Sequence, residues 1–322
     1  MENHLRIHID ELCKERRNPQ SAGYFKAQEY LKSALNSLGL NPLEHHFHVW
    51  GLGKCTNIYA ESKPGSLKPT ILIGAHYETL HCSGPGADDN ASAVAVALEI
   101  ARELFVKGQD FTICFFDMEE NYRFTGLRGS KAFKRFYSRP IEKVLIMDLV
   151  GGSLAPHFDE IYLQFGDSLP KLAHPELDFL HLPMLVVEPM GSIGARSDYD
   201  VFRKAGLPFT FISSGTPWYY HTAFDTPKIL NFKKMAGLTR TLSDALSNRS
   251  ESKTKNDGSL DSFQKFLRTL RKTKVLEFEL IEKLLNQNRL PSRIEMVKLY
   301  KHILPTIRKH GADLWKMRSR NI

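Results

Sequence analysis

The sequence has few cysteines and no long apolar run. Its 4 cysteines, Cys13, Cys55, Cys82 and Cys114, are scattered without paired spacing, which favours free thiols over a disulfide framework. No run of 18 apolar residues is present, and the first residues lack the apolar core of a signal peptide. We therefore expect a cytoplasmic protein without a membrane span.

Two common catalytic motifs are also missing. No Gly-x-Ser-x-Gly occurs, so a serine hydrolase of that type would lack its nucleophile. The segment 51–55 is similar to a phosphate-binding loop, but that pattern needs a glycine where His48 stands and a hydroxyl where Cys55 stands. Both functions are therefore excluded.

The net charge of +8 is concentrated near the end of the chain. Residues 251–322 contain 17 Lys and Arg against 8 Asp and Glu, and the preceding part is close to neutral. Because the basic residues are interspersed with acids rather than clustered in a block, they favour a solvated helical appendage over a nucleic-acid or anionic-membrane surface. We expect this appendage to pack on the core, on a second copy of the chain or on a protein partner.

Three apolar, β-branched runs each end in side chains that can bind metals. The runs are 69–76, 111–120 and 143–148, and they end in His76, in Glu119 with Glu120, and in Asp148. An acidic pair alone is typical of a solvated face, but this pair directly follows an apolar strand. Because sites in open α/β sheets assemble at the carboxyl ends of strands, we expect these side chains to meet.

Two further candidates lie in loops. Asp88 stands in a glycine-rich turn just before a helix predicted over 93–107, and His221 stands in the aperiodic segment 219–227. Imidazole and carboxylate are the ligands that zinc prefers, and a zinc pair needs a bridging carboxylate. Hydrolysis of a peptide bond also needs a group that accepts a proton from water. Five of the six residues can therefore hold two zinc ions, and the sixth can act as a base.

Six motifs carry a resemblance to a known family. They lie at residues 74–79, 85–92, 119–120, 147–148, 196–199 and 220–226. In this order they make the sequence similar to the zinc-dependent exopeptidase family of di-zinc aminopeptidases (peptidase clan MH). That family shares its fold with glutamate-carboxypeptidase-like enzymes and glutaminyl cyclases. The resemblance covers roughly residues 10–248.

The resemblance implies a role for each candidate. Asp88 would bridge two zinc ions, His76 and Asp148 would complete one site, and Glu120 and His221 the other. Glu119 would be the general base. The peptide bond between Asp88 and Asp89 would be cis.

Other residues would support the site. The family usually has Asp where this chain has Glu78, which would orient the imidazole of His76. Asp89 and Asp225 would support the ligands, and Arg196 and Tyr220 would contact the substrate. For Arg196 an ordinary surface position is the alternative.

The remaining pattern predicts the fold. Helices are expected over 22–39, 93–107 and 230–246, and further strands over 43–50, 57–61, 161–165, 184–188 and 209–213. They predict a mixed α/β sheet of about eight strands with helices on both faces, the zinc-exopeptidase (phosphorylase-hydrolase-like) fold. We expect a catalytic domain over 1–248, a linker over 249–260 and a basic helical hairpin or small bundle over 261–322. There, Ser292 and Glu295 form a capping-box pattern.

The candidate residues and the resemblance are consistent with four functions. The first is an aminopeptidase that hydrolyses the N-terminal bond of a peptide or aminoacyl substrate with two Zn²⁺. The alternative is a glutaminyl-peptide cyclotransferase with one Zn²⁺. A carboxypeptidase-type exopeptidase and a non-catalytic binding protein complete the set.

Overall fold

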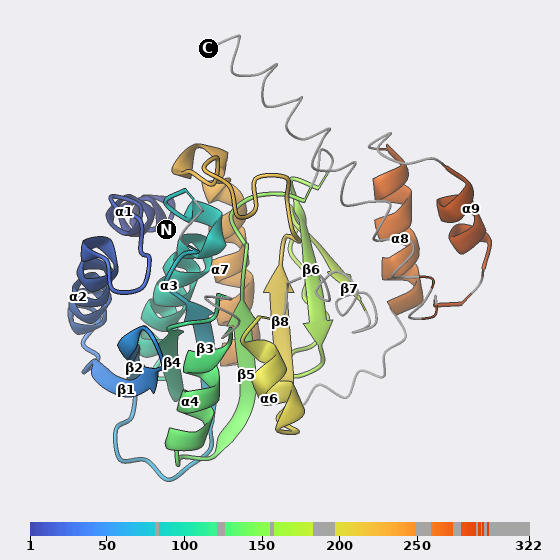
Figure 1. Ribbon diagram of the computed structural model, residues 1–322. Helices are drawn as coiled ribbons and strands as arrows, with labels where there is room; N and C mark the ends of the chain where they lie inside the picture. The colour runs from blue at the N-terminus through green and yellow to red at the C-terminus, as the bar shows by residue number, and fades with distance from the viewer. Residues whose placement is uncertain are drawn as a thin grey trace.

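The computed structural model describes residues 1–80, 84–120, 126–154, 158–182, 197–248, 259–272, 278–287, 289–290, 292 and 295. Within these residues, eight strands form one mixed sheet in the order β1-β2-β4-β3-β5-β8-β6-β7 (Figure 1). The strands are β1 (Leu43–Val49), β2 (Gly53–Glu61), β3 (Thr70–His76), β4 (Phe111–Phe116), β5 (Ile141–Met147), β6 (Ile161–Gly166), β7 (Asp178–His181) and β8 (Phe209–Ser213). The predicted mixed sheet is confirmed.

The four central strands run parallel. β3 pairs with β4 and β5, and β5 pairs with β8, so the carboxyl ends of all four strands lie at one edge of the sheet. Every residue of β3, β4 and β8 is buried, because helices cover both faces and leave no side for polar residues. This arrangement explains the continuous apolar runs in the sequence.

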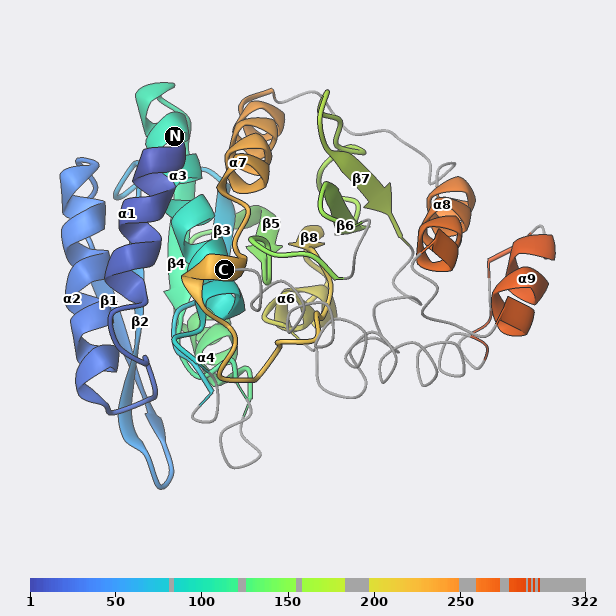
Figure 2. The same ribbon diagram turned by 90° about the horizontal axis from the view of Figure 1, so that it is seen from above.

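The helices form two layers, one on each face of the sheet (Figure 2). One layer shares a core with the sheet through α1 (Glu2–Leu12), α2 (Ala22–Ser37), α3 (Ala93–Val106) and α7 (Phe232–Ser247). The other layer contains α4 (Arg128–Phe136) and α6 (Tyr199–Lys204), whose Phe133 and Phe202 are fully buried. The predicted helices over 22–39, 93–107 and 230–246 correspond to α2, α3 and α7.

Polar side chains cap two helices of the first layer, α2 and α7. The Ser21 hydroxyl accepts a hydrogen bond from Tyr24 N, and the Asn231 side chain accepts one from Lys234 N. Such caps satisfy amide groups that have no partner in the first turn. Helix α1 was not predicted, since only one narrow face, with Leu5, Ile9 and Leu12, is apolar and buried.

Two more helices, α8 (Ser259–Lys272) and α9 (Phe278–Asn286), follow residue 248. Helix α8 lies beside β7, the last strand of the sheet (Figure 1). Its Phe263, Phe266, Leu267 and Leu270 are buried in the same core as Phe158 and Leu180. The predicted capping box is confirmed, because Ser292 N donates to the Glu295 carboxylate and Glu295 N donates to the Ser292 hydroxyl.

Two predicted strands differ from expectation or cannot be compared with the structure. The predicted strand over 184–188 lies outside the described residues, and β7 occupies the end of the sheet instead. Strand β2 begins at Gly53 rather than at residue 57, because a tight connection at Gly51 lets residues 53–59 pair with the whole of β1. Among the described residues, no helix is both long and apolar enough to cross a membrane.

Candidate metal centre

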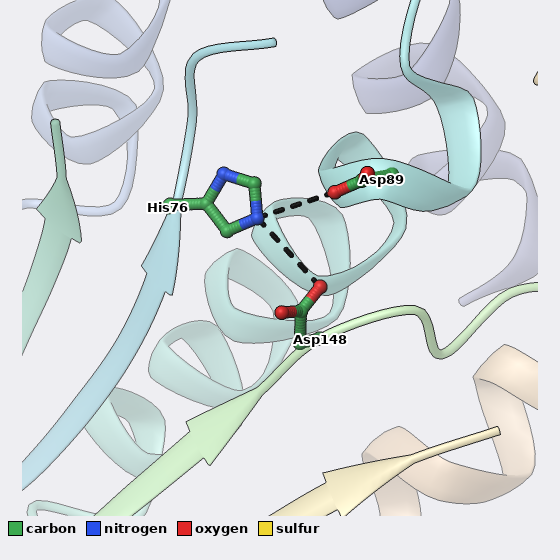
Figure 3. A group of neighbouring side chains, drawn as sticks. All are labelled: His76, Asp89 and Asp148. Atoms are coloured by element: carbon green, nitrogen blue, oxygen red, sulfur yellow. Dashed lines mark ion pairs between the residues drawn. The ribbon is translucent and has the colours of Figure 1, made fainter. Parts of the chain in front are cut away.

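The carboxyl edge of the central strands brings histidine and carboxylate side chains together. His76 ends β3, and Asp148 directly follows β5. The Nε2 atom of His76 lies 3.3 Å from Asp89 Oδ1 and 3.6 Å from Asp148 Oδ1 (Figure 3). Each of the three residues offers one ligand atom, and these atoms lie within 4.8 Å of one another.

A second group shares the Asp89 carboxylate. The Nε2 atom of His221 lies 3.3 Å from Asp89 Oδ2 and 2.9 Å from Glu120 Oε1. One oxygen of Asp89 thus faces His76 and the other faces His221. A carboxylate placed between two sets of nitrogen and oxygen donors is what a pair of bridged metal ions requires.

The structure corrects the role expected of Asp88. Its Oδ1 accepts hydrogen bonds from Gly151 N, Gly152 N and the Ser92 hydroxyl at 2.7, 3.1 and 3.1 Å, and its Oδ2 accepts one from the Tyr219 hydroxyl at 2.7 Å. These donors occupy its lone pairs, and among the described residues the groups that could hold a metal include Asp89 but not Asp88. The prediction of Asp88 as the bridging ligand is therefore wrong by one residue, because the carboxylate that lies between the two histidines is that of Asp89.

The cis peptide bond is displaced by the same single residue. It joins Asp89 and Asn90 rather than Asp88 and Asp89. The Asn90 side chain is held by Met147 O and Leu149 N, which flank Asp148.

Glu78 acts on the centre differently from the expectation. The Nδ1 atom of His76 lies 3.2 Å from the main-chain oxygen of Glu78 and 3.8 Å from its carboxylate. A proton on Nδ1 can therefore be donated to the carbonyl, which leaves Nε2 as the free donor atom. The Glu78 carboxylate instead accepts a hydrogen bond from Glu120 N at 2.9 Å. The longer side chain thus holds the main chain of a second ligand candidate.

Asp225 fixes the main chain on which Asp89 stands. Its two carboxylate oxygens accept hydrogen bonds from Asp88 N at 2.7 Å and Asp89 N at 3.0 Å. Burial, together with the nearby charges of Asp88 and Asp89, raises the pKa of Asp225 to about 8. Next to the centre, the Tyr220 ring stacks on His221 with 3.7 Å between ring centroids. Arg196 lies outside the described residues.

Three residues in the loops that carry the ligand candidates have left-handed backbone angles. Met118, Leu149 and His221 have φ values of 56, 57 and 58°. A non-glycine residue in this region costs on the order of 1–3 kcal/mol and persists where the surroundings enforce it, often at functional sites. The strain lies next to Glu119, next to Asp148 and on His221 itself. This agrees with a functional site whose surroundings enforce these backbone angles.

The electrostatics of the centre favour a cation. His76 Nε2, Asp89 Oδ2 and Asp148 Oδ1 are buried and have no hydrogen-bond partner among the described residues. Burial raises the pKa of Glu119 well above its ordinary value, against the opposing charge of His76. Unsatisfied buried acceptor atoms of this kind are costly unless a positive charge joins them. The residues therefore fit a divalent metal such as zinc.

The sequence reasoning missed one further carboxylate. Asp198 lies at the start of α6, is completely buried, and has a pKa raised by burial to about 7. The motif at 196–199 contains both Asp198 and Arg196, and only Arg196 was predicted to contact the substrate. A buried acid directly before a short helix gives no periodic signal, so only the motif could have indicated it.

Two known proteins are similar in sequence to more than half of this chain. Leucine aminopeptidase 1 of Sclerotinia sclerotiorum is 28% identical over 223 residues, which is 59% of this chain and 54% of that protein. The uncharacterized protein YfbL of Escherichia coli is 31% identical over 248 residues, which is 66% of this chain and 76% of that protein. The chain spans about half the length of the curated leucine aminopeptidases it matches.

Solved structures share the fold. A leucine aminopeptidase precursor from Bacteroides thetaiotaomicron has a TM-score of 0.61 at 18% identity, with 78% of this chain and 98% of that chain covered. Glutaminyl cyclase of Porphyromonas gingivalis has a TM-score of 0.60 at 22% identity, with 78% and 99% covered. A model of peptidase family M28 matches residues 57–246. That match includes every ligand candidate described above, and the chain belongs to peptidase family M28.

Proposed function

We propose that this chain is a zinc aminopeptidase that removes N-terminal residues from peptide or aminoacyl substrates. One observation carries the proposal. The Asp89 carboxylate lies between His76 and His221, and each histidine has one further carboxylate beside it. The names of the curated relatives and membership of a peptidase family support hydrolysis of a peptide bond.

The donor set supports two ions. His76, Asp89 and Asp148 would hold one zinc, and Asp89, Glu120 and His221 the other. Zinc bound there would polarise the scissile carbonyl and lower the pKa of a water molecule. A structural relative from Parabacteroides distasonis is described as a Zn-dependent exopeptidase, which agrees with this choice of metal.

Glu119 would move the proton. Its carboxylate offers an oxygen within 4.8 Å of ligand atoms from both His76 and Glu120, so it stands beside the place where the substrate carbonyl and the water would meet. Its raised pKa makes it a better proton acceptor than an exposed glutamate. It would take a proton from the attacking water and give it to the leaving amine.

The charge of the site favours an N-terminal substrate group. The charges that act on the half-buried Glu119 side chain include the carboxylates Glu120, Asp148 and Asp198. Zinc would neutralise the charges of its ligands Glu120 and Asp148. Asp198 and Glu119 itself would bind no metal, and they would favour the cationic α-amine of a peptide over its C-terminal carboxylate. This supports an aminopeptidase over a carboxypeptidase.

The second candidate is a glutaminyl cyclase, which would cyclise an N-terminal glutamine with one zinc. The observation in its favour is the structural similarity, since glutaminyl cyclases match this fold as well as the aminopeptidase does. The presence of His76 and Asp148 as a second donor pair beside Asp89 favours the two-zinc peptidase.

Metal content and a substrate comparison test the proposal. We expect about two zinc ions per purified chain by mass spectrometry. We expect hydrolysis of aminoacyl substrates to exceed cyclisation of N-terminal glutaminyl peptides. Glu119→Gln should lower kcat by on the order of 10²–10⁴-fold and leave the zinc content unchanged. The exposed Glu142, at the opposite end of β5, provides the matched control Glu142→Gln. Equal activity of wild type and Glu119→Gln would contradict the peptidase, and one zinc with faster cyclisation would favour the cyclase.

A further inference from the structure

Arg17 is a buried arginine outside the part of the chain that matches the peptidase family. It lies between α1 and α2, and the family match begins at residue 57. Its side chain is only 1% exposed. A buried guanidinium is costly unless its donors are satisfied, so the positions of its partners show what it holds in place.

Four hydrogen bonds from this side chain go to main-chain carbonyl oxygens. Nε donates to Tyr77 O at 2.6 Å, and Nη1 donates to Leu12 O at 2.7 Å and Pro85 O at 2.6 Å. Nη2 donates to Gly86 O at 2.9 Å. One planar group therefore joins three separate segments of the chain.

Two of these segments carry the ligand candidates. Tyr77 directly follows His76, and Gly86 stands three residues before Asp89. The main chain of Arg17 adds to the link, because its N–H donates to the Thr79 hydroxyl and its carbonyl accepts from Thr79 N. Gly86 lies close to Arg17 and to Thr79, because a Cβ atom at Gly86 would be 3.1 Å from Arg17 Nη2 and 2.3 Å from Thr79 Cγ2.

The chemistry of arginine suits this task. Its donors lie in one rigid plane, whereas lysine has a single nitrogen on a flexible stem and cannot reach four separated oxygens. Hydrogen bonds from a charged donor are also stronger than neutral ones. The guanidinium therefore fixes the segment after His76 relative to the turn before Asp89.

We infer that Arg17 is a positioning residue for the metal centre, which sets how His76 and Asp89 face each other. The inference rests on the proposed zinc site. The two ligand atoms lie 3.3 Å apart, and a metal site tolerates errors of only a few tenths of an ångström in its donors. The N-terminal segment thereby becomes part of the machinery of the site.

The test uses the full chain with Arg17→Met and Arg17→Lys, and with Arg16→Met as the control at the exposed neighbour. Three properties are measured: Zn²⁺ affinity by competition with a chelating indicator, the visible absorption of the Co²⁺-loaded protein, and thermal unfolding without metal. Arg17→Met should weaken Zn²⁺ binding by about 10–100-fold and alter the Co²⁺ bands. Arg17→Lys should fall between, and Arg16→Met should match the wild type.

A folded Arg17→Met that keeps the wild-type affinity and Co²⁺ spectrum overturns the inference, even if the variant unfolds at a lower temperature. If Arg17→Met does not fold, Arg17→Lys is judged by the same two readouts. If neither folds, the residue serves the whole fold and the inference fails. A wild-type chain that binds no Zn²⁺ would instead overturn the proposed function itself.

Discussion

Asp88 and Asp89 are neighbours with opposite surroundings. Asp88 accepts hydrogen bonds from main-chain amides and from two hydroxyl groups, whereas Asp89 faces two histidines. The turn that holds them has extended backbone angles at Asp89, with φ −110° and ψ 85°. Successive side chains therefore point in opposite directions. One aspartate organises the loops, and the other presents its oxygens to the two histidines.

Substitution of these two residues by asparagine should separate their roles. Asp89→Asn removes the charge and one donor oxygen shared by both donor sets, so zinc content should fall from about two to below one per chain. Asp88→Asn keeps one oxygen for the glycine amides but places an NH₂ group near the Tyr219 hydroxyl. It should retain zinc and lower the free energy of unfolding by about 1–3 kcal/mol. Zinc analysis and urea unfolding of both variants check this, and the reverse pattern would show that Asp88 is the ligand.

The side chains at the strand ends could be predicted from the sequence, whereas the conformation of the turn that carries Asp88 and Asp89 could not. His76 ends an apolar strand, and Glu119, Glu120 and Asp148 follow two others, so strand ends alone indicate where these side chains meet. Residues 84–92 have no period, and the side chain that faces inward depends on local backbone angles that sequence patterns do not give. Arg17 shows the same limit, because its partners are main-chain oxygens up to 69 positions away.

Helix α7 shows how a helix can hold loops at the centre. Its residue Lys234 lies on the buried face, only 2% exposed. The Nζ atom donates to Gly152 O at 2.8 Å and to the Ser214 hydroxyl at 2.9 Å, and it lies 4.3 Å from the centre of the Tyr162 ring. The apolar spacing over 230–246 predicted this helix, but it did not predict a lysine on the inner face. The lysine ties the loops after β5 and β8 to the helix.

The buried Lys234 should make stability depend on pH. Burial lowers the pKa of Lys234 from 10.5 to about 7. Between these values the unfolded chain binds the proton more strongly than the native state does. The free energy of unfolding should therefore gain up to about 1.4 kcal/mol per pH unit from this group as pH rises. Below about pH 7 the group is charged in both states and adds no slope.

Urea unfolding between about pH 7 and 10 measures this contribution. Lys234→Met should remove the rising component, whatever its effect on absolute stability. Lys233→Met is the matched control, because Lys233 is exposed and pairs only with the exposed Glu176 among the contacts described. Parallel pH profiles for the wild type and Lys234→Met would show that the buried lysine does not change its proton affinity on folding.

Helix α8 packs against the main body of the molecule, although the predicted linker before it suggests a loosely attached segment. The predicted linker over 249–260 falls almost entirely on residues outside the described part, so that boundary stays a prediction, as does the cytoplasmic location. Helix α8, however, buries apolar side chains against the sheet, and the rings of Phe266 and Phe158 are 5.8 Å apart. Its basic residues are exposed, and one of them, Lys265, forms a surface ion pair with Asp178 at 2.6 Å. Composition revealed the charge of this segment but not the surface it covers.

A chain that ends at residue 248 should therefore be less stable and more prone to aggregate, although every ligand candidate remains in it. Truncation exposes Phe158 and Leu180 and removes the burial of four apolar side chains of α8, each worth about 1.5–3 kcal/mol. Phe266→Asp in the full chain should reproduce part of the loss. Lys265→Ala should change the unfolding free energy by less than about 1 kcal/mol, because it removes only a surface ion pair. Light scattering and thermal unfolding measure both effects. A truncated chain that stays monomeric and unfolds like the full chain would instead make α8 an independent appendage, so these assays decide between a covering helix and a tethered one.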